Sequence, residues 1–138
     1  MDEARFESIV SLTLGELTRR YPPLEVCGDT IRKAIETIIR SYEAGEKVLI
    51  SGNGGSASDA EHIAGELMKG FLSKRKLSEE AKERFIKAAP ELGKVLAEKL
   101  QTPLEAIALT GQVSLSTAFA NDVDPALVYA QQVFGYGK

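Results

Sequence analysis

The stretch Val48-Leu49-Ile50-Ser51-Gly52-Asn53-Gly54-Gly55-Ser56 decides which fold the sequence predicts. Its first three residues form a short, wholly apolar and partly β-branched run, which is typical of a buried parallel strand. A glycine-rich turn follows, and apolar periodicity then predicts a helix over residues 57–69. We expect the inner face of that helix to consist of Ala60, Ile63, Ala64, Leu67 and Met68. A strand, a glycine-rich turn and a helix in this order present backbone N–H groups and a helix N-terminus to an anion or a group of hydroxyls.

Further elements are predicted on both sides of this stretch. A helix over residues 2–20 ends at Tyr21-Pro22-Pro23, because proline cannot continue a helix and restricts the residue before it. A second helix with a clean apolar stripe is expected between an N-cap at residues 28–30 and a C-cap at Gly45. A second buried strand is predicted at residues 106–109, followed by helices near 114–120 and 125–134, of which Asp124 caps the last.

Residues 73–101 differ in composition from the rest, being charged and strongly helix-forming. We expect a helical hairpin there, divided at Pro90 and inserted on the surface of the domain. A basic cluster near its start is interpreted as a solvated loop rather than a phosphate or nucleic-acid contact; its members are Lys69, Lys74, Arg75 and Lys76. The order of elements indicates an α/β domain with a parallel sheet. Because only two strands are convincing, we expect residues 1–138 to form a single, partial domain.

Composition excludes several classes of protein. The chain holds 17 Lys plus Arg against 20 Asp plus Glu, and this net charge of -3 argues against a general nucleic-acid or anionic-membrane binder. No apolar run approaches the length of a membrane span. The single cysteine, Cys27, cannot form an intramolecular disulfide, which favours a reducing cytoplasm, and we interpret it as a packing residue. With one histidine, one copy of the chain cannot build a site that needs two.

The glycine-rich turn admits more than one interpretation. A Walker A loop requires lysine where Ser56 follows Gly55, so a nucleotide triphosphatase is excluded. Residues 52–57 fit the dinucleotide pattern G-x-G-x-x-G/A, but residues 78–84 form a charged helical stretch where an acidic strand end is needed. A simple strand-to-helix turn, capped by Ser56 or Ser58, also stays open.

His62 and Glu66 are four residues apart and one turn past the glycine loop, so on a helix they share one face. That face lies outside the apolar stripe. A histidine and a carboxylate at this spacing can hold a zinc-type ion or act as an acid/base pair. A surface hydrogen bond worth a few tenths of a kcal/mol, on the order given for such pairs, is the plainer alternative.

Two segments resemble a known family. Residues 49–67, with the string G-N-G-G-S…D-A…H-x-x-x-E, and residues 115–122, which end in Asn121-Asp122, are similar to the sugar isomerase (SIS) family. The closer similarity is to its phosphoheptose isomerase branch. This resemblance implies an α/β fold of the SIS-like three-layer sandwich type, with a flavodoxin- or Rossmann-like parallel sheet that is apparently truncated here. It also implies N-terminal helices that pack a homodimer or homotetramer.

The resemblance further implies roles for particular residues. His62 and Glu66 match metal ligands, with zinc as the possible metal, and Glu66 also matches a catalytic proton-transfer residue. Substrate-binding positions are Asn53, Gly54, Gly55, Ser56, Asn121 and Asp122. The family's Ser/Thr-rich phosphate loop and its distal Gln and His are missing from the 138 residues, so the ligand set is incomplete in this chain.

The activity that the resemblance implies is a ketose–aldose isomerisation of a phosphorylated sugar. Sedoheptulose 7-phosphate would be converted to a heptose 7-phosphate through an enediolate. An alternative is a non-catalytic SIS-type module that binds a sugar phosphate or another protein for regulation. A dinucleotide-dependent reductase is a third hypothesis, which a titration with nicotinamide cofactor would test.

Overall fold

The computed structural model describes residues 3–137 and divides into two compact units, one ending at Ala44 and the other beginning at Gly45. The first unit contains α1 (Glu3–Arg20), the 3₁₀ helix η1 (Pro22–Cys27) and α2 (Gly28–Glu43). The second unit contains β1 (Val48–Ile50), α3 (Gly55–Met68), α4 (Glu79–Ala88), α5 (Pro90–Lys99), β2 (Ala106–Ala108), η2 (Leu109–Gly111), α6 (Val113–Asp122), η3 (Pro125–Leu127) and α7 (Val128–Tyr136). Within the described residues, no helix has both the length and the apolarity that a membrane crossing requires.

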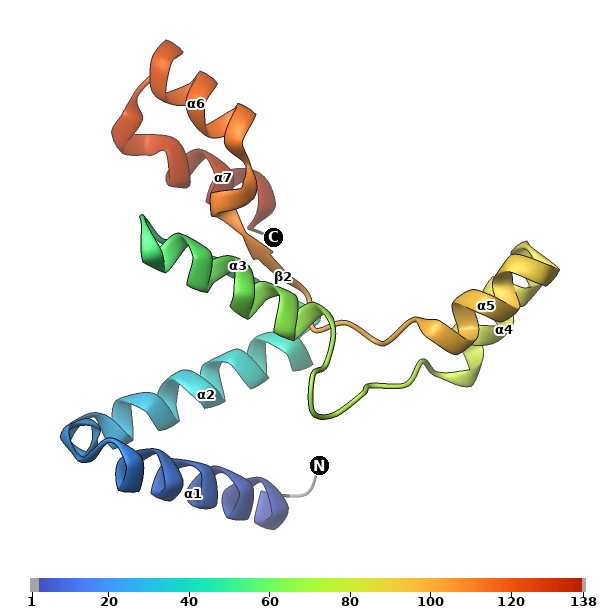
Figure 1. The fold of residues 1–138 in the computed structure, drawn as a ribbon, viewed down its shortest axis with the longest axis horizontal. Coiled ribbons are helices and arrows are strands. Elements are labelled where there is room, and N and C mark those ends of the chain that lie inside the picture. The colour runs from blue at the N-terminus through green and yellow to red at the C-terminus, as the bar shows by residue number, and fades with distance from the viewer. Residues whose placement is uncertain (1–2, 138) are drawn as a thin grey trace. The chain divides into compact units, whose positions relative to one another are not determined.

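In the first unit, α1 and α2 form a helical hairpin (Figure 1). Val10 is its buried apolar residue, and Arg32 reaches across from α2 to α1, with Nη1 2.8 Å from Glu7 Oε2. The N-cap prediction at residues 28–30 is wrong, because α2 begins at Gly28 and its N-cap position, Cys27, makes no side-chain capping bond. Cys27 is also exposed, so the expectation that it packs in a core is wrong.

The second unit is built on a two-stranded parallel sheet. β1 pairs with β2 in the register Val48↔Ala106, Leu49↔Ile107 and Ile50↔Ala108. α3 packs against this sheet, mainly on β2. The α/β fold class with a small parallel sheet is therefore confirmed. The second strand ends one residue earlier than predicted, because Leu109 already belongs to η2.

The core of this unit is narrower than the sequence pattern indicates. Ala60 and Ala64 of α3 are buried, but Ile63 is 49% and Met68 46% exposed, so their placement on the inner face was wrong. At 100° per residue, Ile63 and Met68 lie on either flank of the Ala60–Ala64 line. A sheet of two strands covers only the middle of the helix. The strands themselves are also less enclosed than predicted, since all three residues of β1 keep partial exposure.

Residues 73–101 form a helical pair on a short neck. α4 and α5 lie side by side, and Pro90 begins α5, as the predicted division requires (Figure 1). In the neck, the Arg75 guanidinium donates to the carbonyl oxygens of Leu67 and Thr102, and the Thr102 N–H donates to the Arg75 carbonyl at 2.8 Å. Arg75 therefore serves the fold. That this hairpin is an insertion relative to the family stays a prediction.

The turn between β1 and α3 leaves no room for a side chain at one position. A Cβ on Gly52 would lie 2.3 Å from the carbonyl oxygen of Ser56, a separation that real Cβ atoms essentially never show. Gly54 has φ +57° and ψ -124°, a conformation that favours glycine. The helix begins at Gly55, two residues before the predicted start. The two glycines thus have separate reasons to be glycine: close backbone approach at Gly52 and positive φ at Gly54.

We predict that Gly52→Ala lowers the free energy of unfolding by about 1–3 kcal/mol, the usual cost of forcing extra atoms into a packed site. Urea denaturation of the full chain would measure it. Gly65→Ala is the matched control, because Gly65 lies in α3 with nothing within 4 Å of its would-be Cβ. There the same methyl group should raise stability by up to about 1 kcal/mol. Equal stabilities of the two variants would contradict the prediction.

Candidate functional site

The candidate site begins at the carboxyl end of β1, where parallel α/β sheets place their ligands. Asn53 lies at the tip of the turn and is exposed, as are Gly54 and Gly55. α3 starts at Gly55, and the next two N–H groups, of Ser56 and Ala57, already donate to the carbonyls of Asn53 and Gly54 at 3.2 and 3.1 Å. The Gly55 N–H and the Asn53 amide therefore lie together at the exposed tip of the turn.

The hydroxyl of Ser56 holds the turn closed. Ser56 Oγ accepts from the Asn53 N–H at 2.8 Å and donates to the Asn53 carbonyl at 2.8 Å. The Ser56 N–H also donates to that carbonyl, at 3.2 Å. A serine hydroxyl has one proton and two lone pairs, so only one lone pair remains for a ligand. The structure thus gives Ser56 a role in shaping the loop, and direct substrate binding by it stays a prediction.

Two residues that sequence reasoning missed also contact this region. Tyr129 of α7 donates its hydroxyl to the Gly52 carbonyl at 2.7 Å, across 77 residues of sequence. The hydroxyl of Thr110, in η2, donates to Glu61 Oε1 on α3 at 3.3 Å. No pattern in the neighbouring sequence indicates these contacts. A tyrosine in a short apolar helix, for example, is equally typical of a residue that packs in a core. The carboxyl end of β2 thereby contributes to the same edge as the glycine loop.

His62 and Glu66 share one face of α3, as predicted. His62 Nε2 lies 3.9 Å from Glu66 Oε1, and their side chains are 77% and 44% exposed. The distance from the loop is larger than predicted, because His62 is two turns into a helix that begins at Gly55. A rise of 1.5 Å per residue puts His62 about 12 Å and Glu66 about 18 Å along the axis from Gly54. The pair and the loop are therefore separate parts of one helix surface.

A zinc site needs three or four protein ligands, and the described part of the chain brings fewer together. A tetrahedral zinc holds nitrogen and oxygen ligands roughly 3.3 Å apart, close to the His62–Glu66 separation. Over residues 3–137, however, no group of three His, Cys, Asp or Glu side chains is placed to hold a metal ion. The pair fits as two ligands of such a site and does not complete one.

Asn121 and Asp122 form the last residues of α6, and both are exposed. Asn121 Nδ2 donates to Asp122 Oδ1 at 2.8 Å, so the two side chains are hydrogen-bonded to each other. Among the described residues, no hydrogen bond joins them to the glycine loop. Asp124 follows them and accepts from the Ala126 N–H at 2.8 Å, which confirms its predicted N-cap role. The acidic cluster at this corner is thus partly structural.

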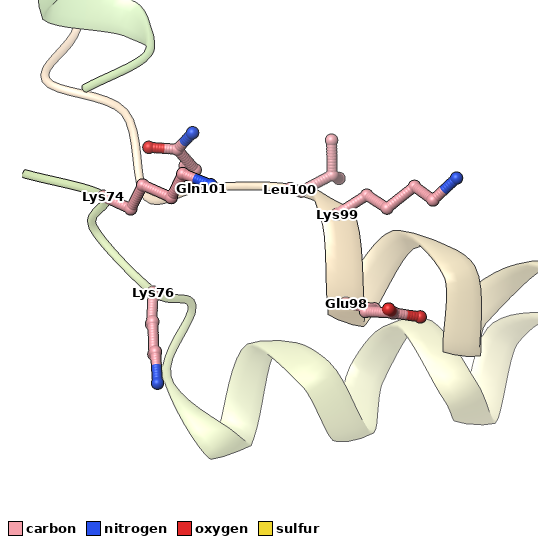
Figure 2. A pocket seen from close by; sticks show the side chains of 6 residues that line it. All are labelled: Lys74, Lys76, Glu98, Lys99, Leu100 and Gln101. Carbon is pink, nitrogen blue, oxygen red and sulfur yellow. The ribbon is translucent and has the colours of Figure 1, made fainter. Parts of the chain in front are cut away.

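A hollow of about 380 Å³ lies at the neck of the α4–α5 hairpin, away from the glycine loop in sequence. It is lined by Lys74, Lys76, Glu98, Lys99, Leu100 and Gln101. Figure 2 shows the three lysine side chains running in different directions, so their ammonium groups do not converge on one point. A single anion would find no focused charge here, and Lys74 and Lys76 are exposed, as the prediction of a solvated loop requires. For Arg75 that prediction is wrong, because its half-buried guanidinium donates to the carbonyls of Leu67 and Thr102.

Comparison with known proteins finds similarity to one family. Residues 24–82 match the SIS domain. The chain is 34% identical to the phosphoheptose isomerase of Clostridium acetobutylicum over 110 residues, which cover 80% of this chain and 43% of that protein. It is 34% identical to the phosphoheptose isomerase of Methylibium petroleiphilum over 114 residues, covering 83% and 44%.

A third phosphoheptose isomerase, from Burkholderia pseudomallei, is 34% identical over 109 residues, which cover 79% of this chain and 42% of that protein. The chain therefore spans less than half the length of the curated relatives it matches. The SIS domain match begins in η1 and runs through the glycine loop and α3, the part of the chain that carries the candidate site. The predicted resemblance to the SIS domain family is thus confirmed.

Proposed function

We propose that this chain acts in the ketose–aldose isomerisation of a heptose phosphate, with sedoheptulose 7-phosphate as substrate. The observation that supports it best is the glycine loop at the carboxyl end of β1, followed on α3 by the His62–Glu66 pair. Two relatives named phosphoheptose isomerase are 34% identical to this chain over 110 and 114 residues. In this proposal the glycine loop binds the polar ligand, and the Glu66 carboxylate transfers the proton.

The glycine loop would bind the sugar. Asn53 presents an exposed amide that can both donate to and accept from sugar hydroxyls. Gly54 and Gly55 lack side chains, so a ligand can approach the Gly55 N–H at the start of α3. Asn121 and Asp122 are proposed as a second contact to sugar hydroxyls. Because Asn121 already donates to Asp122, the remaining lone pairs of the Asp122 carboxylate would do the binding.

Glu66 is the proposed acid/base residue. Its carboxylate would remove a proton from the carbon next to the ketose carbonyl, and the electron pair would form the double bond of an enediolate. The hydroxyl proton of that neighbouring carbon would pass to the former carbonyl oxygen, and Glu66 would return its own proton to the former carbonyl carbon, which yields the aldose. Such proton transfer by a positioned side chain contributes about 10²–10⁴-fold in rate. A metal role for His62 and Glu66 is proposed only as two ligands of a larger set, and no step above depends on it.

We expect Glu66→Gln to lower the turnover of sedoheptulose 7-phosphate at least about 100-fold, because an amide cannot exchange the proton. The KM should change little, since the loop that binds the sugar is untouched. Glu83→Gln is the matched control: Glu83 is an exposed glutamate on α4, and its loss should leave turnover unchanged. Unchanged turnover in Glu66→Gln would remove Glu66 from the mechanism.

A regulatory binding module is the second candidate function. It is favoured by one observation: no third metal-ligating side chain joins His62 and Glu66 in the part of the chain that the structure describes. Calorimetric titration of the full chain with sedoheptulose 7-phosphate, alongside an isomerisation assay, separates the two candidates. Binding with turnover supports the isomerase, and binding without turnover supports the module.

Self-association is also proposed, through the helices of the first unit. α1 and α2 expose several apolar side chains, including Leu12 at 72%, Ile9 at 46% and Ile38 at 40%. A helix that is apolar on more than one side usually packs against another subunit as well as its own neighbour. A second copy of the chain would cover these residues in a dimer or tetramer.

Light scattering of the full chain should therefore give the mass of a dimer or tetramer. Leu12→Asp should shift the mass toward the monomer, because a carboxylate would be buried without a partner. Leu72→Asp is the control, since Leu72 is 93% exposed and lies outside the first unit. A monomeric wild-type chain would contradict the proposal.

A further inference from the structure

One peptide group of the glycine loop is held at both of its ends. The carbonyl oxygen of Gly52 accepts the Tyr129 hydroxyl at 2.7 Å. The N–H of the same peptide group, on Asn53, donates to Ser56 Oγ at 2.8 Å. In a trans peptide the C=O and N–H point in opposite directions, so the two bonds hold the plane from opposite sides. Any rotation of that plane breaks both.

Such a clamp matters here because the loop is otherwise easy to rearrange. Glycine has the widest choice of backbone conformation, and the loop has glycines at 52, 54 and 55. The orientation of the clamped peptide group sets the direction in which Asn53 leaves the strand. It also sets how the chain enters Gly54 at φ +57° and starts α3. One conformation out of several is thereby selected.

Contacts just before and just after Tyr129 in the chain fix the position of the helix that carries it. It lies in the first turn of α7 and is half-buried. The turn before it is capped by Asp124, which accepts from the Ala126 N–H at 2.8 Å. Three residues after it, on the same side of the helix, Gln132 is 1% exposed and donates from Nε2 to Ser116 Oγ of α6 at 3.2 Å. The phenol is therefore presented by an anchored helix.

We propose that Tyr129 is a positioning residue, whose hydroxyl holds the glycine loop in the conformation that presents Asn53 to a sugar phosphate. The Tyr129 hydroxyl contacts the backbone of Gly52, and the loop, not Tyr129, would contact the ligand. Ser56 completes the clamp from the other side. The identity of the ligand rests on the proposed function. The part of the proposal in which Tyr129 fixes the loop conformation is independent of that function.

Tyr129→Phe tests this by removing one oxygen atom. The exchange rate of the Asn53 amide proton with water, measured by NMR on the full chain without ligand, should rise at least about threefold as the loop loosens. Affinity for sedoheptulose 7-phosphate should fall about three- to tenfold, the effect of one net hydrogen bond. In an active chain the loss should appear in KM, with kcat unchanged. Tyr136→Phe removes the same atom from the last residue of α7 and should change neither reading.

A double-mutant cycle with Ser56→Ala adds a reading that a general loss of stability would not give. Because Tyr129 and Ser56 hold one peptide group, the second substitution should cost less affinity once the first is present. Additive losses would overturn the shared clamp. An unchanged Asn53 exchange rate in Tyr129→Phe would overturn the holding of the loop, with or without ligand. Faster exchange with unchanged sugar phosphate affinity would overturn the positioning role. If the wild-type chain binds no sugar phosphate, the proposed function fails, and the exchange rate alone decides the clamp.

Discussion

The arrangement of the second unit depends on the close approach of two backbone segments in the turn between β1 and α3. At Gly52 the backbone lies so near the Ser56 carbonyl that a Cβ would come within 2.3 Å of it. This close passage lets α3 begin after only four intervening residues, 51–54, and still return over the sheet. The buried alanines Ala60 and Ala64 then face β2, and the pairing of β1 with β2 is covered by a helix. A bulkier residue at position 52 would displace all of these contacts together.

The same constraint gives the loop its chemical character. A turn this tight has no internal space for side chains, so its polar backbone groups must find partners nearby or face water. Ser56 satisfies the N–H of Asn53, and Tyr129 satisfies the carbonyl of Gly52. The N–H groups of Ser56 and Ala57 donate to the carbonyls of Asn53 and Gly54, so the Asn53 side chain and the Gly55 N–H are the groups left for a ligand. The loop is therefore rigid where the backbone is held and available where a ligand would bind.

Local patterns predicted the elements well and the tertiary contacts poorly. The strand at 48–50, the glycine turn and the helix break at Pro90 follow from residue types that act within a few positions of themselves. The cap expected at 28–30 failed because capping depends on one residue's backbone conformation, which composition does not fix. Ile63 was misplaced because helix periodicity gives the direction of a face but not the width of the surface that covers it. Within the site, the sequence predicted the loop and the His62–Glu66 pair, while the Tyr129 contact spans 77 residues and has no local trace.

The placement of the candidate site along α3 limits what a ligand must look like. The loop lies at the N-terminus of the helix, and Glu66 lies about 18 Å further along its axis. An extended seven-carbon sugar phosphate is roughly 10 Å long by ordinary bond lengths, so the loop and the Glu66 carboxylate of one copy are too far apart to hold one such molecule between them. One sugar phosphate would contact both features if two copies of the chain shared a site. Because His62 and Glu66 are exposed at 77% and 44%, another protein surface would have to cover them before they could work away from bulk water. The proposed self-association through α1 and α2 would bring in a second copy of the chain, whose surface would be a source of that cover.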